Sequence, residues 1–198
     1  MSRLTCSQCL RPLSVCYCAH IQLQSHDWPI RIIQDSREAK HAIGTARIAA
    51  LSLQQCTLVS VDPESAEDLA ELQQNDPVLI YPGANARPVT DLQGLSTRPL
   101  IFIDASWRRS RRIMHSQPWL QDLPAYELKP DTVSRYRIRK QPQSEALSTL
   151  EAIVSCLQIL EKHPGRFEGL LATMDWMIEQ QISHMGSDTW LRNYRSKE

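Results

Sequence analysis

Short apolar runs alternate with segments of helical periodicity along most of the chain. Apolar runs of this length are typical of buried strands, and their alternation with helices is typical of a parallel sheet. The predicted strands cover 28–35, 57–61, 77–83, 98–104 and 125–129. The predicted helices cover 37–56, an acidic segment at 64–74, a segment that begins at Trp107, and two segments that close the chain. The pattern therefore predicts an α/β domain with a mostly parallel sheet and helices on both of its faces.

The two closing segments carry apolar residues at helical spacing, which marks the faces that pack against the core. Ser148 and Glu151 have the spacing of a capping box, so the first closing helix is predicted to begin there. Its apolar stripe consists of Leu147, Leu150, Ile153, Val154, Leu157 and Leu160. The stripe of the second consists of Phe167, Leu170, Leu171, Met174, Ile178, Ile182 and Met185. Both stripes are predicted to be buried.

The composition is that of a globular protein. Of the 198 residues, 42% are apolar and 22% are charged, which suits one domain with a small appendage. Lys and Arg number 22, as do Asp and Glu, so an anionic partner must be met by local patches rather than by a net field. No segment approaches the roughly 20 apolar residues of a membrane span, and the N-terminus lacks the apolar core of a signal peptide. We therefore expect no membrane partner and a cytoplasmic location, in which the cysteines are reduced.

Four of the six cysteines lie close together near the N-terminus: Cys6, Cys9, Cys16 and Cys18. Two close pairs of thiolates joined by a short loop suit tetrahedral coordination of Zn²⁺ in a closed structural site. An iron–sulfur cluster is an alternative that the number of thiolates leaves open. We predict a zinc module over residues 1–22, ahead of a larger domain over 23–198. The module either braces the fold or presents Arg11 to nucleic acid. The separate Cys56 and Cys156 are interpreted as small buried apolar residues.

Polar residues that follow the predicted strands are candidates for a ligand site, because ligands bind at the carboxyl ends of parallel strands. One group ends the strand 98–104 and consists of Asp104, Ser106 and Trp107. A second group lies at the end of 77–83 and consists of Tyr81, Pro82 and Gly83. A third opens the first closing helix and consists of Leu147, Ser148, Thr149 and Glu151. The free N–H groups at a helix start can hold a carboxylate or a phosphate. The alternative is that Asp104 and Ser148 only cap helices.

Arginines are concentrated in two segments of a chain that has no net charge. Such runs usually form a solvated face, but one of these segments directly follows Asp104 and Trp107, which favours contacts with phosphates. The candidate RNA contacts are Arg47, Arg108, Arg109, Arg112, Arg137 and Arg139. RNA or another polyanion is therefore the expected partner.

Taken together, these features resemble the DTW-domain family of bacterial tRNA-uridine aminocarboxypropyltransferases and their relatives. The resemblance covers nearly the whole chain and rests on the four cysteines, REAKHAIGTAR, LIYPGANA, DASW, YRIRK with LSTLEA, and MDWMIEQQI. Ser106 stands where the family motif normally has Thr, and Asp35-Ser36 stands where the family often has His-Pro. The letters DTW at 188–190 lie outside the context of the motif, and we assign them no role.

The resemblance implies a fold related to the SPOUT methyltransferases, with a C-terminal knot around the cofactor. It also implies S-adenosylmethionine as the group donor, a uridine in the tRNA variable loop as the acceptor, and methylthioadenosine as the by-product. Asp104 would orient or deprotonate uridine N3, Trp107 would stack on a base, and the methionine carboxylate would suit the N–H groups at Ser148. Three alternatives remain. One is a SPOUT-type RNA methyltransferase, the second is a non-catalytic zinc-bearing RNA-binding protein, and the third is ribosomal RNA as the acceptor.

Overall fold

The computed structural model describes residues 4–39, 41, 43–65, 68–129, 134–138, 147–186, 189, 190 and 192. The strands are β1 (Ile30–Asp35), β2 (Cys56–Val61), β3 (Val78–Ile80), β4 (Arg87–Pro88), β5 (Leu100–Asp104) and β6 (Ala125–Glu127). The α-helices are α1 (Ser36–Ala39), α2 (Ala46–Ser52), α3 (Trp107–Ser116), α4 (Trp119–Asp122), α5 (Thr149–Leu160) and α6 (Glu168–Met185). Short 3₁₀ turns lie at Leu13–Val15, Cys18–His20, Ala70–Gln73 and Val89–Leu92.

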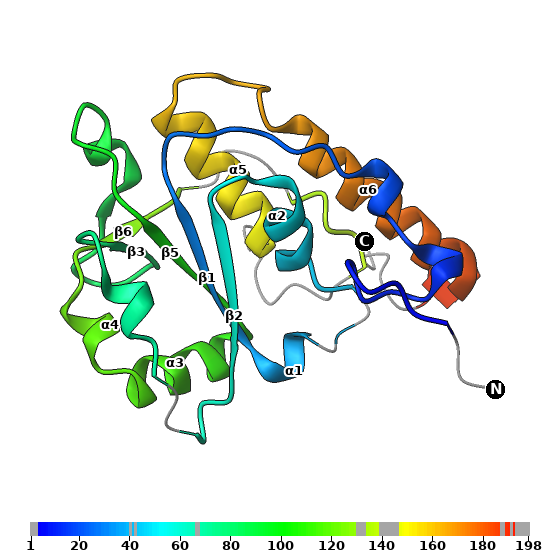
Figure 1. Cartoon of the computed structure of the whole chain (residues 1–198), viewed down its shortest axis with the longest axis horizontal. Helices are drawn as coiled ribbons and strands as arrows, with labels where there is room; N and C mark the ends of the chain where they lie inside the picture. The colour runs from blue at the N-terminus through cyan, green and yellow to red at the C-terminus, as the bar shows by residue number, and fades with distance from the viewer. Residues whose placement is uncertain are drawn as a thin grey trace.

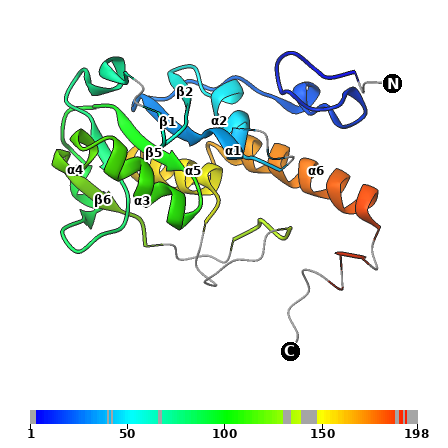
Figure 2. The same cartoon turned by 90° about the horizontal axis from the view of Figure 1, so that it is seen from below.

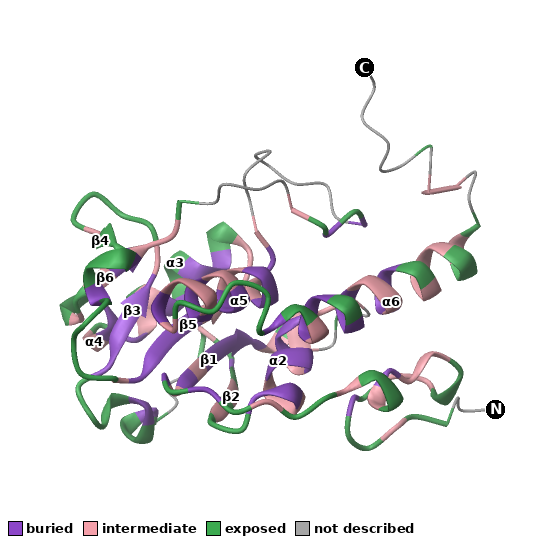
Figure 3. Ribbon diagram, turned by 90° about the horizontal axis from the view of Figure 1, so that it is seen from above, coloured by how far each residue is buried: buried purple, intermediate pink, exposed green. Residues whose placement is uncertain are grey.

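The strands form one parallel sheet in the order β2-β1-β5-β3-β6-β4. Strands β1, β5 and β3 lie inside the sheet and are mostly buried, as expected for strands covered on both faces (Figure 3). In the central register Ile30 and Val78 both pair with Leu100. This register brings the carboxyl ends of β1 and β5 level, with β3 ending beside them.

Two hydrophobic clusters pack on opposite faces of the sheet because successive side chains of a strand point to opposite sides. Ile32 and Phe102 belong to the larger cluster, which includes apolar residues of α2, α5 and α6. Ile33 and Ile101 belong to the smaller one, which includes residues of α3 and α4. Figure 1 shows α3 and α4 on one side of β1 and β5 and α2 and α5 on the other, and in the view of Figure 2 α3 lies in front of α5. The predicted mostly parallel α/β sheet with helices on both faces is therefore confirmed.

The two closing helices are confirmed at α5 and α6, and the predicted capping box opens α5. The Ser148 hydroxyl accepts from the Glu151 backbone N–H, while the Glu151 carboxylate accepts from the Ser148 N–H. Most of the predicted stripe residues are buried, and Gly186, with a φ of 84°, caps the end of α6. Each fully buried Leu or Ile contributes about 1.5–3 kcal/mol to folding, so these stripes fix both helices on the sheet.

The N-terminal segment lies along α6 (Figure 1). The Thr173 hydroxyl donates to the carbonyl oxygen of His20 at 2.9 Å, and the rings of His20 and Trp176 lie with centroids 4.3 Å apart. Cys9 and Tyr17 are buried in the same cluster as the sheet residues. The four-cysteine segment is thus packed against the larger domain.

The predicted helix over 37–56 is replaced by two shorter helices, α1 and α2. Between them the chain passes so closely that a Cβ on Gly44 would lie 3.3 Å from the Glu38 carbonyl oxygen. Arg11 donates to the carbonyl oxygens of His41 and Gly44 in this bend, and these tertiary contacts outweigh the helical periodicity. The predicted acidic helix over 64–74 contains only the 3₁₀ turn Ala70–Gln73 among its described residues, and the very short β4 was not predicted. In the turn, the Asp68 carboxylate accepts from the backbone N–H of Ala70, a side-chain bond that competes with helix formation.

The predicted knot stays a prediction. Residues 130–133 and 139–146, between β6 and α5, lie outside the described part of the chain. Among the described residues, no helix combines the length and the apolar character that a membrane crossing requires.

Candidate functional site

Polar side chains gather at the carboxyl ends of the three central strands. Gln34 and Asp35 end β1, Asp104 ends the adjacent β5, and Tyr81 directly follows β3 on the other side of β5. These positions meet the general rule that ligands bind outside the carboxyl ends of parallel strands. The sheet therefore forms one edge of a candidate active site.

Asp104 is held by two hydrogen bonds from opposite neighbours. The Gln34 amide nitrogen donates to Oδ2 at 2.7 Å, and the Thr149 hydroxyl donates to Oδ1 at 2.5 Å. One donor comes from the adjacent strand and the other from the first residue of α5. These two bonds fix the orientation of the carboxylate. Asp104 is half-buried, so the carboxylate is still reachable from solvent. It is therefore not a helix cap; Ser106 occupies the cap position of α3.

The aromatic side of the site is formed by the ends of β3 and α3. The Tyr81 hydroxyl hydrogen-bonds to Ser110 Oγ at 2.9 Å, and the rings of Tyr81 and Trp107 meet edge to face at 5.8 Å. Trp107 is 47% exposed, which leaves part of its ring available for stacking. The hydroxyl of Ser106 does not cap α3 and is half-buried, while Pro82 and Gly83 are exposed.

The start of α5 has most of its first-turn N–H groups engaged. The Leu150 N–H donates to Thr45 Oγ1 at 3.4 Å, and the Glu151 N–H donates to Ser148 Oγ at 3.3 Å. The capping box therefore occupies donors that the sequence offers to a ligand carboxylate. Thr149 remains the residue of this turn with a direct link to Asp104. Leu147, just before the cap, is half-buried.

Glu151 also fastens to α5 the second arginine-rich segment, here called the basic segment and described over residues 134–138. Its carboxylate is 5% exposed and accepts from the Ser134 hydroxyl and, at 2.6 Å, from the Arg135 backbone N–H. The Tyr136 hydroxyl then donates to the Ile43 carbonyl oxygen at 2.6 Å. These bonds give Glu151 a positioning role between the capping box and residues 134–138.

Arg109, which the sequence suggests as an RNA contact, is instead buried at 8% exposure and bonded to Asp35. Burial by itself raises the pKa of Asp35, but the hydrogen bonds from Arg109 and from the Arg37 backbone N–H outweigh it and lower the pKa. The guanidinium also lies 3.6 Å from carboxylate oxygens of Asp62 and Glu64. Arg109 therefore links α3 to β1 and the loop after β2, and it is not free to meet a phosphate.

The other candidate RNA contacts differ in their partners. Arg112 pairs with Glu64 at 3.3 Å, and Arg137 pairs with Glu179. Arg108 is exposed, and within the described part of the chain it has no ion pair. Arg47 is half-buried in the wall of a pocket, and Arg139 lies outside the described residues. Arg108 is thus the most available of these cations next to Trp107.

The four N-terminal cysteines converge, as their spacing predicts. The Sγ atoms of Cys6 and Cys18 lie 3.6 Å apart, as do those of Cys9 and Cys16, and all four lie within 4.8 Å of one another. A zinc ion with Zn–S bonds of about 2.3 Å needs sulfur–sulfur separations of about 3.8 Å. The donor set and its spacing therefore fit a tetrahedral metal site.

The pKa values of the thiols in this crowded cluster are shifted in different directions. A backbone hydrogen bond from Cys9, followed by one from Gln8, lowers the pKa of Cys6 to about 6. Burial raises the pKa of Cys18 to about 12 and also raises that of Cys9, with the neighbouring thiols adding to the effect. Outside the cluster, Cys156 is fully buried and Cys56 is half-buried, close to their predicted character.

Gln34, Asp35 and Ser110 belong to the site but are absent from the sequence-derived candidates. The first two could have been found because they are polar residues that end a predicted buried strand beside the one that ends at Asp104. Ser110 had no such signal, since its role depends on the hydroxyl of Tyr81, which lies 29 residues away.

Comparisons with known proteins agree on one family. A family model described as the DTW domain matches residues 3–182. The tRNA-uridine aminocarboxypropyltransferase 2 of Drosophila melanogaster is 27% identical over 96% of this chain and 82% of its own length. The proteins of the same name from Mus musculus and Macaca fascicularis are 29% and 30% identical over 92% of this chain. The aligned region spans 65% of the length of each of these two relatives. No solved structure matches. The chain belongs to the DTW-domain family.

Proposed function

We propose that this protein is a tRNA-uridine aminocarboxypropyltransferase. The reaction would move the 3-amino-3-carboxypropyl group of S-adenosylmethionine to N3 of a uridine in tRNA. The observation that carries the proposal is the fixed carboxylate of Asp104 at the carboxyl end of the central strand, beside an exposed indole. Membership of the DTW-domain family and the names of the relatives support it.

Asp104 is suited to hold the N3–H group of uridine in line for transfer. S-adenosylmethionine, as the group donor, would supply an electrophilic carbon next to its sulfonium, and the leaving group would be methylthioadenosine. The new bond joins N3 to that carbon, the carbon–sulfur bond breaks, and the N3 proton passes to Asp104 or to water. Orientation of this kind lowers barriers by up to about 7–11 kcal/mol in favourable systems, which makes positioning the main task of the site.

The aromatic residues and the start of α5 are proposed to define the donor side of the site. Tyr81, with Pro82 and Gly83 behind it, would border the adenosine, and Trp107 would stack on a base. Thr149 connects this side to Asp104 through its hydroxyl. Ser148 and Glu151 hold α5 and the basic segment in place around it.

The basic residues are proposed to contact tRNA phosphates. Arg108 is the leading candidate because it is exposed and lies next to Trp107 in α3. Arg112 and Arg137 would contact RNA only by sharing or leaving their carboxylate partners. Arg139 is proposed on sequence alone, and Arg109 is now assigned to positioning α3.

Zn²⁺ is proposed as a structural ion held by Cys6, Cys9, Cys16 and Cys18. All ligand positions would be filled by thiolates, so the ion has no open position for catalysis. Its role is to fix the N-terminal loop against α6 and α2. Cysteines that bind a metal instead of forming disulfides also suit the cytoplasm, which we propose as the location of the protein.

The test is to incubate the purified protein with S-adenosylmethionine and unmodified tRNA, then to identify the products by mass spectrometry. A nucleoside enlarged by one aminocarboxypropyl group, together with methylthioadenosine, is the expected result. Methylated nucleoside with S-adenosylhomocysteine would instead assign the protein to the methyltransferases. Binding of tRNA with no consumption of the donor would refute an enzymatic role.

A further inference from the structure

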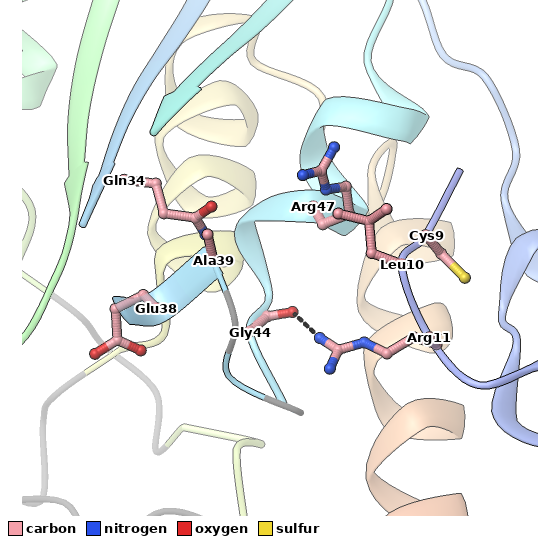
Figure 4. A pocket seen from close by; sticks show the side chains of 8 residues that line it. All are labelled: Cys9, Leu10, Arg11, Gln34, Glu38, Ala39, Gly44 and Arg47. Atoms are coloured by element: carbon pink, nitrogen blue, oxygen red, sulfur yellow. Dashed lines mark hydrogen bonds between the residues drawn. The ribbon is translucent and has the colours of Figure 1, made fainter. Parts of the chain in front are cut away.

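A pocket of about 330 Å³ lies between the four-cysteine loop and the segment that runs from β1 to α2 (Figure 4). Leu10 and Arg11 form its wall on the loop side. Gln34, Glu38 and Arg47 form the wall on the side of the sheet and helices. Its volume is at the lower end of the roughly 300–1,000 Å³ found for ligand sites, which suits a single nucleotide.

This pocket adjoins the candidate active site through one shared side chain. Gln34 lines the pocket, and its amide nitrogen donates to Asp104 Oδ2 at 2.7 Å. The amide oxygen of Gln34 is the remaining polar atom of that group and can accept a hydrogen bond. A group held in the pocket would therefore lie one side chain away from the carboxylate.

The pocket is richer in cations than in anions. Arg11 donates to the carbonyl oxygens of His41 at 2.9 Å and Gly44 at 3.4 Å, so its charge is not neutralised by these partners. Arg47 has no ion pair within the described residues. With Glu38 as the only carboxylate among the described lining residues, two guanidinium groups face one carboxylate. Such a lining favours a phosphate-bearing ligand.

We propose that this pocket binds the acceptor nucleotide, with its phosphate toward Arg11 and Arg47 and the edge of its base toward Gln34. The assignment rests on the proposed function and names the subsite for the RNA substrate. The N3–H of uracil is a donor that can meet the amide oxygen of Gln34 or the Asp104 carboxylate. Cytosine has an acceptor at N3 and cannot form this bond, so the same contact selects uridine.

The four-cysteine loop then becomes part of the substrate site. Arg11 follows Cys9 by two residues, and its bonds to the segment before α2 close the pocket on that side. Leu10 adopts a left-handed φ of 58°, which the folded loop maintains. A metal held by the cysteines would stabilise this wall. Removal of the metal is expected to weaken the binding of tRNA itself, independently of the transfer step.

The direct test uses wild-type protein and tRNA that carries photoreactive 4-thiouridine at the acceptor position. After irradiation, digestion and mass spectrometry, the crosslink is expected in peptides that contain residues 9–11 or 34–47. A crosslink confined to α3 or to the β3–β4 segment would overturn the assignment. The experiment needs no turnover. A wild type that crosslinks in the pocket yet transfers no aminocarboxypropyl group would therefore contradict the proposed function and leave the pocket assigned.

Steady-state kinetics of Arg47→Ala provide a second readout. Loss of one phosphate contact is expected to raise the KM for tRNA by about tenfold or more, while the KM for S-adenosylmethionine stays unchanged. The matched control is Arg98→Ala. Arg98 lies just before β5, at the end of the strand opposite to Asp104, and it pairs with Asp76. An increase in the KM for S-adenosylmethionine would assign the pocket to the donor. Unchanged values for both substrates would remove its role in binding.

Discussion

Thr149→Val is the sharpest perturbation of the site, because it removes one hydrogen bond and changes little else. The Thr149 hydroxyl donates to Asp104 Oδ1 at 2.5 Å. Valine has nearly the same shape but no hydroxyl, so among the described residues Gln34 alone still donates to the carboxylate. Asp104 would then rotate about its side-chain bonds and lose its alignment with uridine N3.

The size of the effect follows from the type of bond and from the exposure of Asp104. A hydrogen bond to a charged group contributes about 1.5–3 kcal/mol. Asp104 is only half-buried, so water replaces part of the lost bond, and about 1–2 kcal/mol is the expected loss in the transition state. This corresponds to a decrease in kcat of about 5- to 30-fold.

The assay is steady-state transfer to unmodified tRNA, with Thr149→Ser as the control. Serine keeps the hydroxyl and should restore most of the rate, whereas both variants should keep the wild-type KM for tRNA and the wild-type Tm. A valine variant with the kcat of the wild type would refute the idea that Thr149 positions Asp104. A serine variant as slow as the valine variant would show that the hydroxyl alone does not hold Asp104, which would contradict the role given to this bond.

Three further outcomes follow from the charges, the thiols and a buried histidine. Metal analysis should find about one Zn²⁺ per chain, and Cys9→Ser should lose it and lower the Tm; a stable wild type without metal contradicts this. Arg108→Ala should reduce the salt dependence of tRNA binding by a log–log slope of about 1, and Arg112→Ala, whose cation is already paired, should reduce it less. Burial lowers the pKa of His26, whose ring also bonds the Trp28 carbonyl and the Gln55 N–H, so the folded state keeps it neutral when the unfolded chain takes up a proton. The contribution of neutral His26 to the free energy of unfolding is therefore fully present above about pH 6.5 and is lost as the pH falls below it. In thermal melts, the Tm of His26→Gln should decrease less between neutral and acidic pH than the Tm of the wild type.

Local patterns predicted the elements that rest on local physics. The apolar runs that became β1 and β5 stand out because both faces of those strands are covered, and the Ser148–Glu151 spacing identified the start of α5. The helix predicted over 37–56 shows the limit of such patterns. Its periodicity is helical, but Arg11 binds the carbonyl oxygens of His41 and Gly44 from about 30 residues earlier in the chain, and no local pattern contains these tertiary contacts.

Some residues of the candidate site are recognisable in the sequence for the same reason. The cysteine spacing specified a cluster, and the strand end specified Asp104, because both signals lie within a few residues of sequence. The partners of the arginines could not be predicted in this way. Arg109 is bonded to Asp35, 74 residues earlier in the chain, so a sequence shows its charge but not that the charge is already neutralised. Gln34 likewise gains its role from Asp104 on a neighbouring strand.

The measurement closest to the central claim follows two labels of S-adenosylmethionine into tRNA, one in the methyl group and one in the methionine carboxyl. The wild type is predicted to place the carboxyl label in tRNA and leave the methyl label in methylthioadenosine. Asp104→Asn should still bind both substrates, but it should transfer the carboxyl label at a rate at least about 100-fold lower than that of the wild type. Methyl label in the RNA, or transfer by Asp104→Asn at the wild-type rate, would contradict the account.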